Sequence, residues 1–206
     1  MKKIIISLMI LSMLTACAGA VAEAPRNGGR GNGAGGGSMQ TLNEGIAYMN
    51  GDGVDQDYEK ALELFMEAFE AGSMKAARYV GMVYEQGLGV EQDYEKAAEY
   101  YAKGVEAGDL TSGYYLGLLY KQGLGVEQNY AKAAELFASV EASENKPATG
   151  VVAAGYELGA LYEQGLGVEQ DLNKAMELYE EAASYENQDA IDALARLSKS
   201  GAVTKG

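Results

Sequence analysis

The stretch Tyr84-Glu-Gln-Gly-Leu-Gly-Val-Glu-Gln-Asp-Tyr-Glu-Lys-Ala97 occurs in four versions along the chain. The glycine pairs at the centres of the four versions lie in Gly51-Asp-Gly-Val54, Gly87-Leu-Gly-Val90, Gly123-Leu-Gly-Val126 and Gly165-Leu-Gly-Val168. Their first glycines are 36, 36 and 42 residues apart. A repeat with a period in this range is typical of stacked helix pairs. The stretch therefore predicts the end of one helix, a tight turn and the start of the next helix.

The residues of this stretch suit those three tasks. Gly87 can adopt the left-handed conformation at a helix end because it has no Cβ, and Gly89 permits a second bend. Val90 is placed to fill the corner between the two helices. Asp93 is a good N-cap for the second helix. The equivalent positions of the other three copies also hold capping residues, namely Asp57, Asn129 and Asp171.

The segments between the turns have helical periodicity. In the second copy we expect a helix A over 73–86 and a helix B from Asp93 to about Ala107. Gly81 lies inside helix A, where glycine costs up to about 1 kcal/mol relative to alanine. The other copies carry matching glycines, Gly45, Gly117 and Gly159. A cost that recurs four times indicates close helix packing, and we expect the small partner in helix B to be Ala97, matched by Ala61, Ala133 and Ala175.

This pattern resembles the Sel1-like repeat, a relative of the tetratricopeptide repeat. The best match is Leu158-Gly159-Ala-Leu-Tyr162-Glu-Gln-Gly165-Leu-Gly167-Val168-Glu-Gln-Asp171-Leu-Asn-Lys174-Ala175. The resemblance covers about residues 40–197 and implies an all-α fold, an α-solenoid of four helix-turn-helix repeats with a C-terminal capping helix. The expected array spans 40–200, with units at about 40–72, 73–108, 109–147 and 148–186 and the cap at 187–198. Glu44 replaces the usual leucine, as suits an end repeat that faces water.

The third unit departs from the period. Residues 139–154 hold six extra residues, with Pro147 and Gly150 among them. We expect a longer loop here between helix B and the next helix A. The insertion is either a tolerated surface change, which we favour, or a lip on a binding face.

The first 39 residues have a different character. Met1-Lys-Lys precedes an apolar run of 13 residues, 4–16, which is too short to span a bilayer but suits a secretory signal. Leu14-Thr15-Ala16-Cys17 resembles a bacterial lipobox, which implies cleavage of 1–16 and lipidation of Cys17. The alternative is an ordinary signal peptide with an incidental cysteine. The glycine-rich segment 17–39 is expected to be a flexible tether that links the array to a membrane.

Composition excludes several functions. The chain has 16 basic and 30 acidic residues, no histidine and one cysteine, and its net charge is −14. Such a charge repels nucleic acid, whereas it tolerates a basic partner or serves solubility alone. A single cysteine allows no disulfide within the chain, and the commonest general base and metal ligand is absent. We therefore expect no metal and no cofactor.

No catalytic pattern emerges from the remaining polar residues. Asn50-Gly-Asp52-Gly53 imitates part of a calcium loop, but Tyr48 stands where its first acid is needed. The abundant glutamates recur with the period, as expected of solvated faces. Histidine-based nucleophile systems are absent, because the chain has no histidine. Some cysteine-rich Sel1-like proteins have been proposed to act on β-lactams, but their paired cysteines are missing here. We predict that the protein is not an enzyme.

The candidate binding surface is the concave face, which helices A line in such solenoids. The position before the Leu-Gly pair is usually polar and outward in the family. In this chain it holds Asn43, Tyr79, Tyr115 and Glu157. The two tyrosines either form an exposed aromatic stripe or pack as core. Met82 and Leu118 are expected to border the same groove.

Together these observations predict a monomeric scaffold that is lipid-anchored outside the cytoplasm, on the cell membrane or the outer membrane. It is expected to bind a protein or peptide through its helical-repeat surface, an expectation that rests on family analogy. The alternatives are a glycan- or peptidoglycan-binding module and a β-lactam or cell-wall hydrolase.

Overall fold

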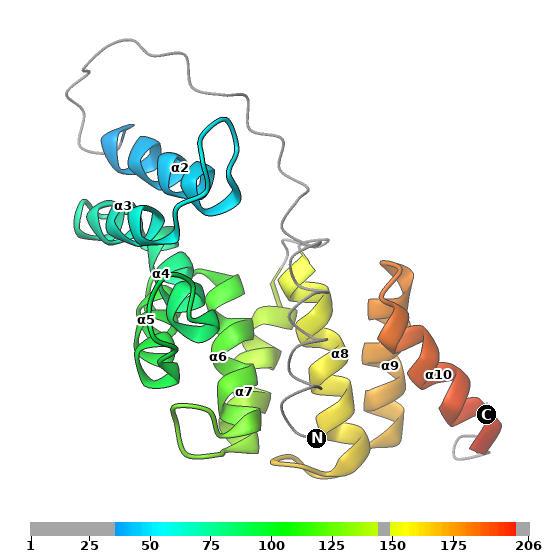
Figure 1. The fold of residues 1–206 in the computed structure, drawn as a ribbon. Helices are drawn as coiled ribbons and strands as arrows, with labels where there is room; N and C mark the ends of the chain where they lie inside the picture. The colour runs from blue at the N-terminus through cyan, green and yellow to red at the C-terminus, as the bar shows by residue number, and fades with distance from the viewer. Residues whose placement is uncertain (1–35, 144–148, 201–206) are drawn as a thin grey trace. The chain divides into compact units, whose positions relative to one another are not determined.

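The computed structural model describes residues 36–143 and 149–200, and all regular secondary structure in these two ranges is helical. The helices are α2 (Gly36–Asn50), α3 (Tyr58–Glu70), α4 (Met74–Gln86), α5 (Tyr94–Glu106), α6 (Leu110–Gln122), α7 (Tyr130–Glu141), α8 (Thr149–Gln164), α9 (Leu172–Ser184) and α10 (Gln188–Ser200). Each helix packs against the next one along the chain (Figure 1). The all-α repeat fold is therefore confirmed. The signal, Cys17, most of the tether and Pro147 lie outside the described residues.

The helix boundaries follow from the residues at the turns. Asp57, Asp93, Asn129 and Asp171 are the N-caps of α3, α5, α7 and α9, and each side chain accepts a backbone hydrogen bond of 2.9–3.0 Å from the lysine three residues later. Gly87 and Gly123 end α4 and α6 in the left-handed conformation, with φ of 67° and 70°. These features confirm the expected turn. Such caps satisfy backbone groups that a helix end leaves unpaired.

A glutamine before each N-cap also closes the turn. The Gln92 side-chain amide donates a 2.7 Å hydrogen bond to the Glu85 carbonyl at the end of α4. Gln56, Gln128 and Gln170 make the same bond in the other copies, to Met49, Lys121 and Glu163. Side chains of the turn thus hydrogen-bond both to the end of the preceding helix and to the start of the following one.

The glycine inside each helix A faces an aromatic ring and not the expected alanine side chain. A Cβ on Gly81 would lie 2.7 Å from two carbons of the Tyr101 ring on α5. Gly45, Gly117 and Gly159 face Phe65, Phe137 and Tyr179 in the same way. A flat ring needs a side-chain-free surface to lie against. The missing Cβ therefore makes room for a large residue. The expected alanine approaches through its backbone in two repeats, since a Cβ on Gly45 or Gly159 would lie 3.3 Å from the carbonyl oxygen of Ala61 or Ala175.

The second glycine of the turn rests on the preceding repeat. A Cβ on Gly125 would lie 2.1 Å from the Tyr94 carbonyl carbon, at the start of α5. Gly53 in the first turn has no such neighbour within 4 Å in the described structure, and Val54 beside it is 39% exposed. The first turn also has Asp52 where the others have leucine. A polar residue suits this position because, among the described residues, no helix pair precedes α2 and α3 to cover it.

The insertion in the third unit lengthens a helix. Helix α8 has 16 residues, whereas α4 and α6 have 13. Gly150 lies in its first turn, and Val151 is buried at 1% exposure. The expectation that Gly150 belongs to a loop is therefore corrected. Helix α8 includes this added turn because Val151 is buried in the hydrophobic core.

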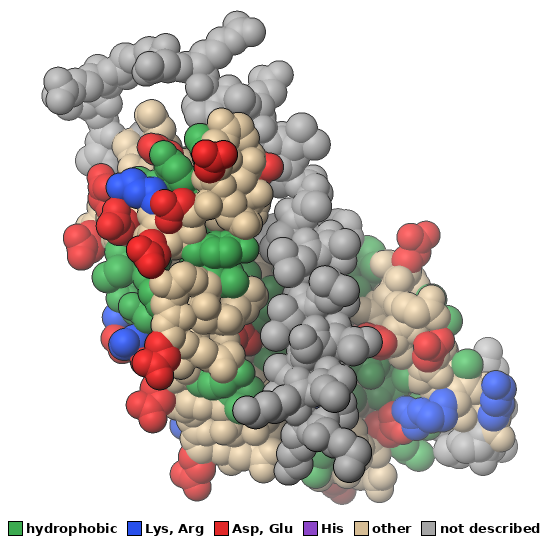
Figure 2. Space-filling view, in the orientation of Figure 1, with side chains coloured by type: hydrophobic (Ala, Val, Ile, Leu, Met, Phe, Trp, Pro, Cys, Tyr) green, Lys and Arg blue, Asp and Glu red, His purple; other side chains and the backbone are tan. Residues whose placement is uncertain are grey.

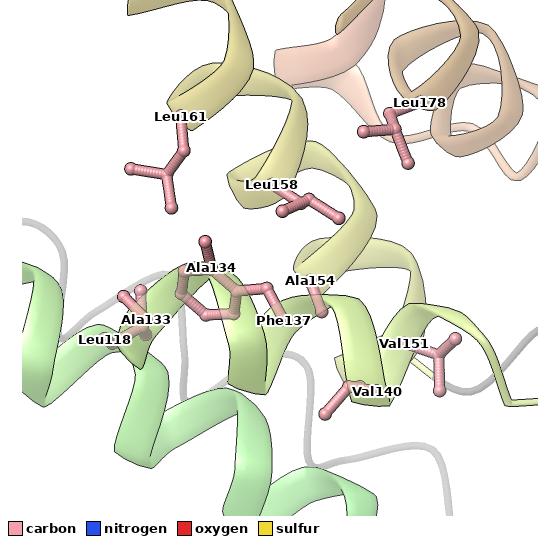
Figure 3. Close-up of a cluster of buried hydrophobic side chains, with 10 residues drawn as sticks. All are labelled: Leu118, Ala133, Ala134, Phe137, Val140, Val151, Ala154, Leu158, Leu161 and Leu178. Carbon is pink, nitrogen blue, oxygen red and sulfur yellow. The ribbon is translucent and has the colours of Figure 1, made fainter. Parts of the chain in front are cut away.

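The core runs through the array in overlapping clusters. Figure 3 shows one of them, in which Phe137 of α7 lies among aliphatic side chains from four helices: Leu118, Ala133, Ala134, Val140, Val151, Ala154, Leu158, Leu161 and Leu178. At the C-terminal end, Ala190, Ala193 and Leu197 of α10 bury against Tyr179 and Ala182 of α9. Helix α10 therefore closes the described array, as expected of the capping helix.

Candidate functional site

Three helices A form a continuous surface. Helix α4 contacts α6, and α6 contacts α8, in addition to the helices B that flank them. Tyr79, Tyr115 and Glu157 occupy equivalent positions on these three helices. We call the surface formed by Arg78, Tyr79, Tyr115, Lys121 and Glu157 the helix A face. In Figure 2, hydrophobic side chains, a class that includes tyrosine, reach the surface over α4 and α6.

The two tyrosines of this face are half-buried. Tyr79 stacks on Phe65 of α3, with ring centroids 5.0 Å apart, and the Arg78 guanidinium lies 4.9 Å from the centre of the Tyr79 ring. Tyr115 stacks on Tyr101 of α5 at 5.3 Å. Each ring thus packs one side on a helix B and leaves part of its surface open. The tyrosines therefore lie between the two alternatives of an exposed stripe and core packing, because each ring packs on the core and is still partly exposed.

The other predicted residues have different surroundings. Glu157 pairs with Lys121 across α6 and α8 at 2.5 Å, and their side chains are 14% and 29% exposed. Asn43 on α2 is exposed. Met82 and Leu118 are buried, with 8% and 7% exposure. They lie about one helical turn beyond the tyrosines and face the packed interior, so the expectation that they border a groove is corrected.

A second ion pair joins α4 to α6, and sequence reasoning did not find it. Arg78 donates a 3.1 Å hydrogen bond to Asp109, whose side chain is 10% exposed. Asp109 is also the N-cap of α6 and accepts hydrogen bonds from the Ser112 amide and hydroxyl at 3.0 and 2.7 Å. One carboxylate therefore starts a helix and ties it to its neighbour. In the sequence, Asp109 is recognisable only as a possible capping residue, and its pairing with Arg78 is not.

A tyrosine–glutamate pair lies beside this face in two repeats. The Tyr101 hydroxyl donates a 2.5 Å hydrogen bond to Glu85 at the end of α4, and Tyr179 donates a 2.8 Å bond to Glu163 at the end of α8. Burial raises the pKa of Glu85, and the bond from Tyr101 opposes that shift. Hydrogen bonding from Arg196 lowers the pKa of Glu163. The two carboxylates thus share one position in the repeat but have opposite electrostatic surroundings.

The sequence did contain a signal for these pairs. Tyrosine follows glutamate by 16 residues in both cases, and the same spacing in the other two repeats joins Met49 to Phe65 and Lys121 to Phe137. The hydroxyl occurs only where a carboxylate can accept from it. A comparison of the four copies at this spacing identifies the pair without a structure.

Groups of three or more aspartate, glutamate, cysteine or histidine residues that could hold a metal ion are absent from 36–143 and 149–200. A small pocket between α7, α8 and α9 is lined mainly by apolar side chains, among them Val151, Leu178 and Tyr185. Among the described helices, none is both long and apolar enough to cross a membrane.

Comparison with known proteins agrees with this geometry. The sequence profile of the Sel1 repeat matches residues 45–73, 75–109, 114–139 and 152–184. The chain belongs to the Sel1 repeat family. Sel1 repeats commonly mediate protein–protein interaction, and proteins built from them are generally non-catalytic scaffolds. No curated protein matches this Sel1 repeat chain.

Two solved structures resemble this Sel1 repeat protein over most of its length. One is a protective antigen of uropathogenic Escherichia coli with an SLR fold, which is 30% identical with a TM-score of 0.72 and is matched over 81% of this chain and 34% of its own. The other is a Sel1 repeat protein from Oxalobacter formigenes, which is 28% identical with a TM-score of 0.69, over 78% of this chain and 63% of its own. The chain therefore spans about a third of the first relative and under two thirds of the second.

Proposed function

We propose that this Sel1 repeat protein is a non-catalytic scaffold that holds a protein or peptide partner on the helix A face. The observation that carries the proposal is the seating of Tyr79 and Tyr115 on aromatic rings of the helices beneath them. Stacked rings lose little conformational freedom when a partner binds, because they are already held in place. Half-exposed tyrosines of this kind supply apolar contact area together with a hydroxyl.

Two ion pairs make the same surface rigid. Arg78 and Asp109 join α4 to α6, while Lys121 and Glu157 join α6 to α8. Each of these side chains is less than a third exposed, so water screens the pairs less than it screens surface pairs. The three helices therefore present the tyrosines with a fixed spacing. A preformed surface of this kind favours recognition of a partner without a large rearrangement.

Chemical crosslinking and pull-down from envelope extracts test this proposal. The double variant Tyr79→Ala/Tyr115→Ala should lose partners that the wild type retains. Tyr185→Ala is the matched control, because Tyr185 is 40% exposed and lines the small pocket between α7, α8 and α9, which contains none of the residues that define this face. Circular dichroism must show native helix content in both variants. An unchanged partner set for a folded double variant overturns the proposal.

We further propose that a lipid on Cys17 anchors the scaffold outside the cytoplasm. The support is the order of charged start, apolar run and cysteine in residues 1–17. Several acyl chains on one terminus give firm membrane attachment, where one chain does not. Radiolabelled palmitate should label the wild type and fail to label Cys17→Ala. Equal labelling of the variant removes the anchor from the proposal.

A further inference from the structure

The last repeat shows what its tyrosine-bound carboxylate can bind. Glu163 accepts the Tyr179 hydroxyl and also both terminal nitrogens of Arg196 on α10, with Nη2 2.8 Å from Oε2. A carboxylate and a guanidinium in this fork arrangement form one of the strong ion-pair geometries. The guanidinium comes from the helix that follows the repeat, 33 residues further along the chain. The capping helix therefore supplies an internal ligand for this position.

The second repeat has the same carboxylate but lacks that ligand. Glu85 accepts the Tyr101 hydroxyl, and the residue 33 positions further on is Leu118, which is buried. Within the described part of the chain, Glu85 has no salt bridge and no cation among the groups that shift its pKa. Because Glu85 lacks a cation among these residues, only the Tyr101 hydrogen bond offsets the cost of desolvating this half-buried carboxylate. The site is therefore electrostatically incomplete.

Two nearby carboxylates are already paired with cations. Asp109 is paired with Arg78, and Glu157 with Lys121. Glu85 occupies on α4 the position that Lys121 has on α6, so it lies beside the helix A face. Unlike Asp109 and Glu157, Glu85 thus has no cation of its own in the described structure that would compete with an incoming positive charge. The chain's net charge of −14 also favours approach of a basic partner.

Aromatic side chains lie on one side of the Glu85 carboxylate. Tyr101 bonds to it, and Tyr115 stacks on Tyr101. The Gln92 side-chain amide donates to the Glu85 backbone carbonyl at 2.7 Å and to the Tyr94 hydroxyl at 3.0 Å, so the Tyr94 phenol also lies near Glu85. A planar guanidinium can bond a carboxylate edge-on while it stacks on an aromatic face. These surroundings favour arginine over lysine.

We propose that Glu85 is a binding site for an arginine side chain of the partner held on the helix A face. The inference rests on the proposed function, since it names the chemistry by which that surface selects its partner. Arg196 at Glu163 is the template, because it shows a guanidinium bound to the glutamate of the equivalent tyrosine–glutamate pair in the same chain. The partner's arginine would form with Glu85, in the second repeat, the ion pair that Arg196 of α10 forms with Glu163 in the fourth repeat.

Titration of the full chain, kept in solution with a neutral detergent, tests the site. The probe is N-acetyl-arginine amide, and N-acetyl-citrulline amide is its neutral control of the same shape. Resonances of the tyrosine rings report binding by nuclear magnetic resonance. The arginine probe should give saturable shifts that the citrulline probe does not give. Glu85→Gln should weaken binding at least about tenfold, because the charge-assisted bonds are lost.

Two further variants make the result specific. Glu135→Gln removes an exposed carboxylate from α7 and should leave the titration unchanged. Arg196→Gln frees Glu163 and should add a second binding event. Absence of saturable shifts, equal shifts with citrulline, or unchanged binding by Glu85→Gln overturns the arginine site. The proposed function survives that result if Tyr79→Ala/Tyr115→Ala still loses its partners, so the two failures are distinguishable.

Discussion

The hydroxyl of Tyr101 donates a 2.5 Å hydrogen bond to the carboxylate of Glu85, which lies 16 residues earlier on the preceding helix. The same relationship joins Tyr179 to Glu163 at 2.8 Å. The other two repeats have neither the hydroxyl nor the carboxylate, since they carry Met49 with Phe65 and Lys121 with Phe137. Donor and acceptor therefore occur together, as expected where an unpaired polar group would be costly.

Replacement of Tyr101 by phenylalanine should lower the free energy of unfolding by about 1–2 kcal/mol, because it leaves a half-buried carboxylate without its donor. Tyr179→Phe is the matched control and should cost less, since Glu163 keeps its bonds to Arg196. Urea denaturation followed by circular dichroism measures both. A larger loss for Tyr179→Phe contradicts the assigned roles.

The first repeat suggests a rescue of this variant. Tyr101→Phe/Glu85→Met installs the pair that Met49 and Phe65 form in the first repeat. The double variant should be more stable than Tyr101→Phe alone, because both polar groups are then removed together. Denaturation midpoints under identical conditions compare the two. If the second substitution adds a further loss, the hydrogen bond is not the source of the first one.

Gly81→Ala should destabilise the protein by about 1–3 kcal/mol, a cost typical of overpacking, because its Cβ would lie 2.7 Å from the Tyr101 ring. Gly155→Ala is the control inside another helix A. Its Cβ meets the Glu141 side chain at an ordinary 3.6 Å, so the better helix propensity of alanine should leave stability equal or raised by up to about 1 kcal/mol. Thermal unfolding distinguishes the variants. Equal melting temperatures would refute the role of the ring contact.

Asp109→Asn keeps an oxygen that can cap α6 but removes the charge that pairs with Arg78. We expect a loss of about 2–4 kcal/mol, because the Arg78 guanidinium is only 20% exposed and would remain uncompensated. A double-mutant cycle with Arg78→Gln should give a coupling energy above about 0.5 kcal/mol. Glu63→Gln, which breaks the exposed pair with Lys60, should leave stability nearly unchanged. A coupling energy near zero contradicts the structural role of the buried pair.

The two tyrosine-bound glutamates should respond oppositely to pH. Hydrogen bonding from Arg196 lowers the pKa of Glu163, so its stabilising contribution is present above the unfolded pKa and is lost as pH falls through the folded value. Arg196→Gln should therefore reduce stability at neutral pH, and its difference from the wild type should shrink in acid. Unfolding free energies measured between about pH 3 and 8 check this. A difference that grows in acid has the wrong sign.

Glu85 should show the reverse dependence. Burial raises the pKa of Glu85, so the folded state holds its proton more tightly, and stability falls as pH rises from the unfolded to the folded value. Glu85→Gln cannot ionise and escapes this loss. The variant should therefore gain stability relative to the wild type as the pH is raised across that window. The same pH series measures the difference in unfolding free energy between Glu85→Gln and the wild type. A difference that does not change with pH would contradict a raised pKa of Glu85.

The repeat, the helix boundaries and the capping residues could be derived from the sequence because they depend on local backbone physics. Gly87 ends α4 through its own conformational freedom, and Asp93 starts α5 through a bond to a residue three positions away. Every copy repeats these short-range relationships, so the four copies together strengthen the prediction of the helix boundaries. The insertion near Gly150 was harder to interpret, because burial of Val151 against other helices extends α8.

Only the tertiary structure decided which residues meet across helices. The pattern alone did not show that Gly81 faces the Tyr101 ring, or that Met82 and Leu118 turn inward, because those contacts depend on how neighbouring helices pack. The contrast between Glu85 and Glu163 is of the same kind. Their local sequences are nearly identical, and the difference arises because a following helix supplies Arg196 in one case and Leu118 in the other. Interactions between residues close in the sequence thus determined the repeat. Contacts between helices determined that Glu163 pairs with a cation and that Glu85, within the described part of the chain, does not.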